Sequence, residues 1–163
     1  MRKLLRWLGY GLAAIVGLLL VGAAWIWFAS SREINRAYAA APERLVRPTA
    51  EQLADAERQA RILGCFSCHG EGLAGRMMFS APGVAEIWSP NLTHVAADAS
   101  DEQLARALRQ GIGVDGEPLF VMPSAMYSRL SDGEVAALVA LIRAQPRRGG
   151  ATPQPWLGPL GRF

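Results

Sequence analysis

The segment from Trp7 to Ala29 carries no charged side chain and consists mostly of apolar residues. As an α-helix, a segment of this length extends about 35 Å, which is enough to cross a hydrocarbon core of about 30 Å. Tryptophans stand near both ends, at Trp7 and at Trp25 and Trp27, as is typical of residues at the two membrane interfaces. The sequence therefore predicts a single-pass membrane anchor over residues 1–30.

Three basic residues precede this segment and predict its orientation: Arg2, Lys3 and Arg6. The positive-inside rule places the N-terminus in the cytoplasm and everything after the anchor on the periplasmic side of the inner membrane. The same residues account for the net charge of +3, because the remaining basic residues equal the 14 acidic ones in number. A neutral exported part has no basic surface for nucleic acid, so we expect the lipid bilayer as a partner and no nucleic acid.

A cleaved secretory signal is the alternative interpretation of this segment. The apolar region of such signals spans about 7–15 residues, and this one is longer. The small residues Ala29, Ser30 and Ser31 are nevertheless compatible with cleavage. Both interpretations export the rest of the chain.

Beyond the anchor we expect a spacer over residues 31–48, a domain over residues 49–146 and a Pro/Gly-rich, extended tail over residues 147–163. Three capping boxes predict helix starts in the domain, each a Ser or Thr followed three residues later by Gln or Glu, at Thr49, Ser100 and Ser131. The predicted helices end near Gly64, Gly111 and Pro146. Because no segment alternates with a period of two, we expect few strands or none and an all-α fold.

Both cysteines fall in one pentapeptide, Cys65-Phe66-Ser67-Cys68-His69. The C-x-x-C-H spacing is typical of covalent c-type haem attachment, in which two thiols bond the macrocycle and the histidine coordinates iron. A haem would also supply core for the long irregular stretch at residues 64–99, which three helices alone cover poorly. The sequence thus predicts one covalently bound haem c, with His69 as an iron ligand.

These residues have three other possible uses. A thioredoxin-like redox pair needs a βαβ pattern, which the sequence lacks. A zinc site could draw on Cys65, Cys68, His69 and His94, but the adjacent Cys68 and His69 suit one tetrahedral ion poorly. A simple disulfide between the two exported cysteines is the remaining alternative.

The second iron ligand has to come from elsewhere in the chain. We favour Met122, because it precedes Pro123 in an irregular stretch that leads to the last helix. The other candidates are Met77, Met78, Met126 and His94. Pro82 or Pro90 could offer a carbonyl to the His69 ring. Contacts with the haem propionates are open to Arg76, Trp88 and Asn91, and we expect Tyr127 to serve in packing.

The motifs CFSCH, SPNLT (residues 89–93) and VMPSAMYSRLSDGEVAALVALIR (residues 121–143) resemble the monohaem class I cytochrome c domains. The chain is most similar to the cytochrome c subunits of membrane-bound bacterial dehydrogenases. In that family, the methionine of an M-P-x-x-x-[YF] segment is the distal ligand, which maps onto Met122, with Tyr127 at the aromatic position. The resemblance implies a small helical domain wrapped around one haem.

Iron bound by both His69 and Met122 has no open position for a substrate, which suits one-electron transfer rather than bond chemistry. We therefore expect a membrane-anchored electron carrier of the respiratory chain rather than an enzyme. Its redox partners would be a dehydrogenase, a quinol-oxidising complex or a terminal oxidase. A fixed subunit of a larger oxidoreductase complex, or a haem sensor or enzyme with a labile sixth ligand, are the alternatives.

Overall fold

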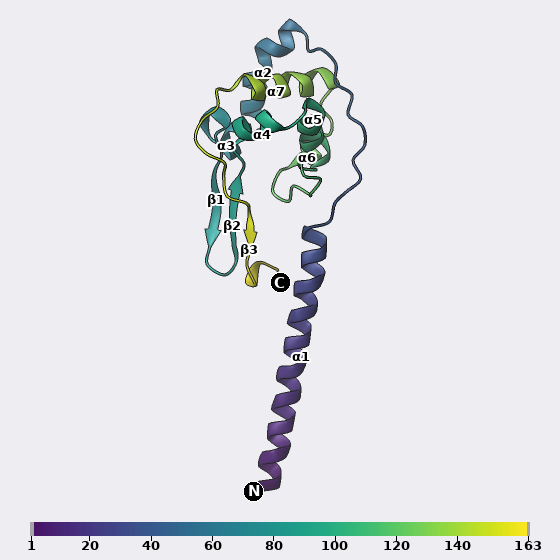
Figure 1. Cartoon of the computed structure of the whole chain (residues 1–163), viewed down its shortest axis with the longest axis vertical. Coiled ribbons are helices and arrows are strands. Elements are labelled where there is room, and N and C mark those ends of the chain that lie inside the picture. Colours follow the sequence, from purple (N-terminus) through teal and green to yellow (C-terminus); the bar gives the residue numbers. More distant parts are fainter. Residues whose placement is uncertain (1, 163) are drawn as a thin grey trace.

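The computed structural model describes residues 2–162, so the first residue of the predicted anchor and the last residue of the predicted tail lie outside it. Helix α1 (Arg2–Ile34) is long and straight, contains no buried residue, and extends away from the rest of the chain, which it meets only near its C-terminal end (Figure 1). Within the described residues, α1 is the helix that is long and apolar enough to cross a membrane. It continues past Ala29, so the first residues of the predicted spacer are helical.

The three predicted capping boxes are confirmed. They begin helices α2 (Ala50–Ile62), α5 (Asp101–Gln110) and α7 (Asp132–Ala144). In each, the side chain of the Ser or Thr accepts a hydrogen bond from the backbone N–H of the third helical residue. The side chain of that third residue accepts one from the backbone N–H of the Ser or Thr. Gly111 ends α5 with a φ of 66°, and α7 ends before Pro146. These reciprocal bonds satisfy backbone donors that a helix end otherwise leaves free.

The core lies where α2, α5 and α7 meet. Its buried side chains include Ala60, Leu104, Leu108, Leu138 and Val139. Four short helical elements surround it: α3 (Cys65–His69), η1 (Glu71–Leu73), α4 (Leu92–Asp98) and α6 (Ser124–Tyr127). Helices dominate the domain, so the prediction of an all-α fold class is confirmed.

A small antiparallel sheet accompanies the helices, in the order β1 (Arg76–Ala81), β2 (Ala85–Ser89) and β3 (Trp156–Leu157). The period-2 pattern did not reveal β1, because a strand alternates only when one face is buried and β1 is exposed almost throughout. The β1–β2 hairpin matters for the site, since it returns the chain to α3 at Ser89 and Pro90.

The predicted tail is not free. Asn91 donates to the carbonyl oxygens of Arg148 and Gly150 at 2.7 and 2.9 Å, and β3 then pairs with β2. The last helical turn, η2 (Leu160–Arg162), lies beside the upper part of α1 (Figure 1). The tail therefore runs back from α7 along the domain to the C-terminal end of α1.

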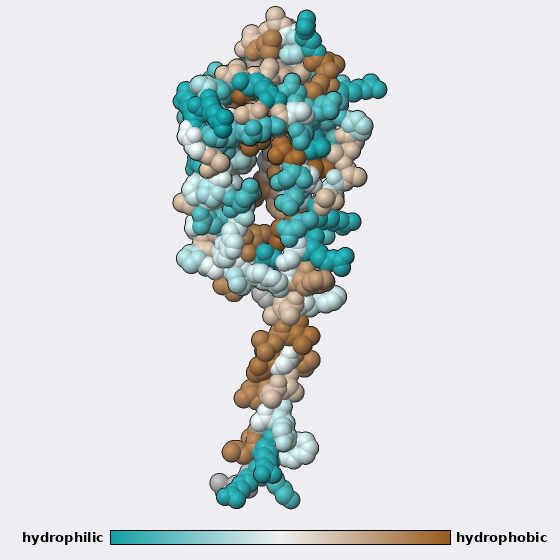
Figure 2. Space-filling model, in the orientation of Figure 1, coloured by the Kyte–Doolittle hydropathy of each residue, from teal (hydrophilic) through white to brown (hydrophobic). Residues whose placement is uncertain are grey.

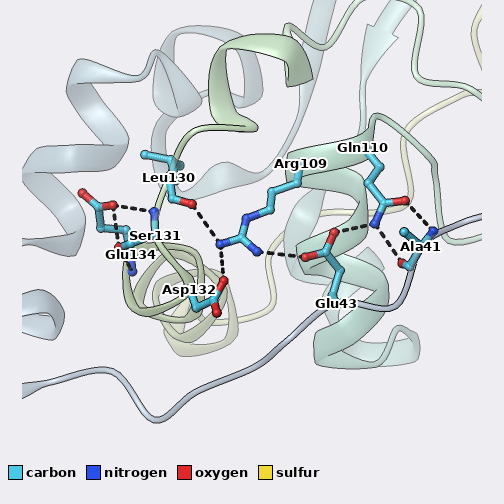
Figure 3. Close-up of polar contacts among 8 residues, drawn as sticks. All are labelled: Ala41, Glu43, Arg109, Gln110, Leu130, Ser131, Asp132 and Glu134. Atoms are coloured by element: carbon cyan, nitrogen blue, oxygen red, sulfur yellow. Dashed lines mark hydrogen bonds and ion pairs between the residues drawn. The ribbon is translucent and has the colours of Figure 1, made fainter.

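The irregular spacer after α1 is also attached to the domain (Figure 3). Glu43 accepts from Arg109 at 3.1 Å, and Arg109 also donates to Asp132 and to the Leu130 carbonyl. Gln110 exchanges hydrogen bonds of 2.9 Å with the backbone of Ala41. These contacts hold the middle of the spacer on α5 and on the start of α7.

Candidate haem-binding site

Gly64 separates the C-cap of α2 at Leu63 from the first residue of α3, Cys65, and its φ of 81° turns the chain. Cys65 and Cys68 lie three residues apart, which places both side chains on one face of α3. Both are free thiols and partly buried. Burial raises the pKa of the Cys65 thiol, so this thiol is protonated at neutral pH.

His69 ends α3 and is buried. Its Nδ1 lies 2.9 Å from the carbonyl oxygen of Pro90. A carbonyl oxygen can only accept, so Nδ1 carries the proton and the lone pair of Nε2 remains for another partner. Burial lowers the pKa of His69, which also favours the neutral ring. A neutral histidine held by a carbonyl through one nitrogen is typical of a metal ligand.

Of the two prolines that the sequence offered for this role, the structure pairs Pro90 with His69. Pro82 lies in the turn between β1 and β2, whereas the end of β2 reaches α3. Ser89 secures this junction, because its hydroxyl donates to the Cys68 carbonyl oxygen at 2.5 Å and accepts from the Arg76 N–H at 3.1 Å. Sequence reasoning missed Ser89, since nothing local distinguishes it from an exposed serine.

Met122 lies two residues before α6 and, like Cys65, packs partly buried against the core cluster. Two contacts fix this region. The Ser124 hydroxyl donates to the Ala107 carbonyl oxygen at 3.1 Å, and the Tyr127 hydroxyl donates to the Leu63 carbonyl oxygen at 2.9 Å. Tyr127 is buried in the core, so the expected packing role is confirmed, and its hydroxyl also ties α6 to the residue before Gly64.

The other candidates for the second iron ligand are placed less favourably. Met126 is 69% exposed, and Met77 and Met78 lie on the exposed strand β1. Both ring nitrogens of His94 are engaged, one with the Gly149 carbonyl oxygen and one with Arg147. Among residues 2–162, no group of three or more His, Cys, Asp and Glu side chains is arranged to hold a metal ion.

The three residues suggested for the haem propionates make other contacts. Asn91 is buried, caps α4 through the Thr93 N–H and holds the tail. Trp88 donates to Glu86, and Arg76 donates to the Ser67 carbonyl oxygen. Asn91 is therefore a structural residue here, while Arg76 stays beside the Cys-x-x-Cys helix.

The shape of the domain fits a flat apolar group. Figure 2 shows an open gap through the domain, partly lined by hydrophobic residues, between the side that carries the sheet and the side that carries α5 and α6. Large apolar side chains on both flanking segments are exposed: Met77, Met78 and Phe79 on β1, and Phe120 and Val121 before α6. Exposed clusters of this kind are typical of a binding site. The residues present thus fit a haem held at α3.

Comparison with known proteins identifies the family. The family described as "Cytochrome C oxidase, cbb3-type, subunit III" matches residues 51–142, which is more than half of the chain. The chain belongs to this family of cytochrome c domains. Membership implies haem c and electron transfer, in agreement with the interpretation of the C-x-x-C-H motif.

One curated relative is the "Fructose dehydrogenase cytochrome subunit" of Gluconobacter japonicus. It is 37% identical over 91 residues, which cover 50% of this chain and 18% of the relative. The chain therefore matches less than a fifth of that subunit's length. The similarity agrees with the predicted likeness to cytochrome c subunits of membrane-bound dehydrogenases.

Proposed function

We propose that this cytochrome c domain carries one haem c, bound through Cys65 and Cys68 and coordinated by His69 and Met122. We further propose that α1 anchors it in the inner membrane, where it transfers single electrons on the periplasmic side. The observation that carries the proposal is the His69–Pro90 hydrogen bond of 2.9 Å, which presents Nε2 of a neutral ring directly after two free thiols. When bound, haem c supplies the reversible one-electron oxidation of its iron.

The residues around α3 have separate roles. Cys65 and Cys68 would hold the haem covalently through their sulfur atoms and so keep it from dissociating. Pro90 holds the His69 ring by its Nδ1–H and raises the basicity of Nε2. Ser89 keeps the Pro90 carbonyl oxygen in position through its bond to Cys68.

The segment of Met122 is suited to supply a second ligand that stays in place. Pro123 follows Met122 and precedes α6, and the Ser124 N–H donates to the Met122 carbonyl oxygen at 2.8 Å. Ser124 and Tyr127 then hold α6 on α5 and on Leu63. A methionine fixed in this way leaves no open position for a substrate, which favours an electron carrier over an enzyme or a gas sensor.

The membrane assignment rests on α1. Its apolar stretch, its lack of buried residues and its basic N-terminal residues support an inner-membrane anchor with the N-terminus inside. The haem domain then lies on the periplasmic side, close to membrane-bound redox partners. A dehydrogenase, a quinol-oxidising complex or a terminal oxidase are the partners we propose.

A fixed subunit of a larger oxidoreductase complex is the second candidate function. The observation in its favour is the similarity to a cytochrome subunit of a dehydrogenase. Purification of the full-length protein from its native membrane in mild detergent distinguishes the two candidate functions. A fixed subunit copurifies with its partners at constant stoichiometry, whereas a free carrier does not.

The site is tested with optical spectra of the wild type, Met122→Ala and Met126→Ala, in both oxidation states. We expect the methionine-to-ferric charge-transfer band to disappear in Met122→Ala and the reduced variant to bind carbon monoxide rapidly. Met126→Ala is the matched control, because Met126 lies four residues away and is exposed. A charge-transfer band retained in Met122→Ala refutes the ligand assignment, and mass spectrometry of the intact protein counts the haems.

A further inference from the structure

The end of the domain nearest to α1 is built from the turn of the β1–β2 hairpin (residues 82–84) and the tail (residues 156–162), here called the proximal end. Two backbone bonds join its parts: the Gly158 N–H donates to the Val84 carbonyl oxygen at 2.7 Å, and the Leu160 N–H donates to the Gly83 carbonyl oxygen at 2.9 Å. Gly158 lies so close to the Gly83 backbone that a side chain there would overlap it. The hairpin turn and the tail therefore form one unit.

Arg162 fixes this unit to a definite level of α1. Its guanidinium lies 4.1 Å from the centre of the Trp27 ring, and its Nη1 donates to the hydroxyls of Ser30 and Ser31 at 3.3 and 2.8 Å. Trp27 stands two residues before Ala29, where the apolar stretch of α1 ends. Since tryptophan at the end of a membrane helix lies at headgroup depth, the proximal end lies there too.

The surface of the proximal end suits that depth. The sequence has no charged residue between Arg76 and Glu86 or between Arg148 and Arg162, which are the two segments that form it. Trp156 is 49% exposed and Leu160 67% exposed. In Figure 2 the surface under the sheet, at the lower left of the domain, is pale to brown rather than deep teal. Charged residues border this surface at Glu86, which lies opposite Trp156 in the sheet, and at Arg162. Moving the large apolar side chains between them from water into the interface of a bilayer is favourable.

We propose that the proximal end is a second membrane contact, in which Trp156 and Leu160 enter the headgroup layer of the leaflet from which α1 emerges. The proposal rests on the membrane anchor proposed above and adds an orientation to it. Contact at α1 and at the proximal end stops the domain from rotating freely on its spacer. The side with the sheet then faces lipid at its lower edge, and the α2–α7 end points away from the membrane (Figure 1).

Site-specific photo-crosslinking of the full-length haem-loaded protein tests this. The variant Leu160→p-benzoylphenylalanine is placed in nanodiscs of phosphatidylethanolamine and phosphatidylglycerol, irradiated and analysed by mass spectrometry for lipid adducts. The same replacement of Leu19 in α1 and of Leu53 on α2 gives the controls, and Leu53 is 47% exposed but at the opposite end of the domain. The haem absorbance of each variant reports whether it is folded.

We expect lipid adducts at positions 160 and 19 and none at position 53. Adducts at position 19 without adducts at position 160 overturn the second contact and leave the anchor intact. If position 19 gives none, the anchor itself fails. In native membranes, crosslinks from position 160 to a protein instead of lipid also overturn the proposal, because the proximal end would then be a subunit interface.

Discussion

His69 and Pro90 are 21 residues apart in sequence and joined by a hydrogen bond of 2.9 Å between Nδ1 and the backbone carbonyl oxygen. The bond exists because the β1–β2 hairpin folds back on α3 and because the Ser89 hydroxyl holds the returning strand to Cys68. A carbonyl that accepts from the proximal ring makes the ring a stronger donor to iron and stabilises the ferric state. The hairpin between α3 and α4 is thus part of the proposed haem site.

Ser89→Ala is expected to raise the midpoint potential, because the Pro90 carbonyl oxygen then holds His69 less firmly. A tenfold change in relative affinity for the two oxidation states corresponds to about 59 mV for one electron, which sets the upper end of the expected shift. Spectroelectrochemical titration measures it. Ser80→Ala is the matched control, since Ser80 lies exposed on β1 in the same hairpin. An unchanged potential in Ser89→Ala would refute this role of Ser89.

Arg109→Ala is expected to destabilise the domain strongly. The Glu43 side chain is 6% exposed and that of Arg109 15%, so the variant leaves a carboxylate buried without its main partner. Such a loss costs about 3–5 kcal/mol. Urea unfolding of the haem-loaded protein measures the effect, and limited proteolysis should show new cleavage within residues 36–48. Arg58→Ala breaks the exposed pair with Asp55 and should cost far less. Equal losses in the two variants would contradict the inference that the spacer is held by a buried ion pair.

Glu134 makes the stability of α7 sensitive to acid. Hydrogen bonds from the Ser131 hydroxyl and backbone N–H lower the pKa of Glu134 below its usual 4.5. Because the folded pKa is lowered, the contribution to stability is complete above about pH 4.5 and is lost as pH falls through the folded pKa.

Glu134→Gln tests this dependence on pH. The other two capping boxes use Gln at this position, so the variant retains the cap and removes only the charge. At pH 7 it should be less stable than the wild type by about 0.3–1 kcal/mol, and the difference should vanish below the folded pKa. Urea unfolding of the variant and the wild type, at pH 7 and at a series of lower pH values, measures the difference in the free energy of unfolding. Glu117→Gln is the control, because the exposed Glu117 caps no helix. A difference that persists in acid would contradict the prediction.

Gly75→Ala is expected to disrupt the contact between the hairpin and the tail. Gly75 has a φ of 79°, and a Cβ there would lie 2.6 Å from Thr152 and 2.8 Å from the Ser89 carbonyl oxygen. Backbone strain of about 1–2 kcal/mol adds to overpacking of about 1–3 kcal/mol. Gly116→Ala is the matched control, since Gly116 also has a positive φ but nothing within 4 Å. Urea unfolding should give a clearly larger loss for Gly75→Ala, and similar losses would refute the close approach.

Local chemistry explains what the sequence could predict. A capping box is closed by residues three apart, so Thr49, Ser100 and Ser131 mark the helix starts without reference to the rest of the chain. The C-x-x-C-H pentapeptide likewise places Cys65, Cys68 and His69 on one short helix. The apolar stretch of α1 is long enough for a membrane by composition alone. These features determined the family, the fold class and the cofactor.

Contacts between distant residues were decided only by the tertiary structure. Pro90 rather than Pro82 contacts His69 because of the way the hairpin folds back. The exposed strand β1 lacks the alternation of apolar and polar residues that would predict the hairpin from the sequence. The spacer is held by Glu43 and Arg109, which are 66 residues apart, and Arg162 reaches Ser31 across 131 residues. Because such pairs are brought together by packing rather than by spacing, the sequence alone predicted a spacer and an extended tail without their contacts. The folded chain attaches both of them to the domain.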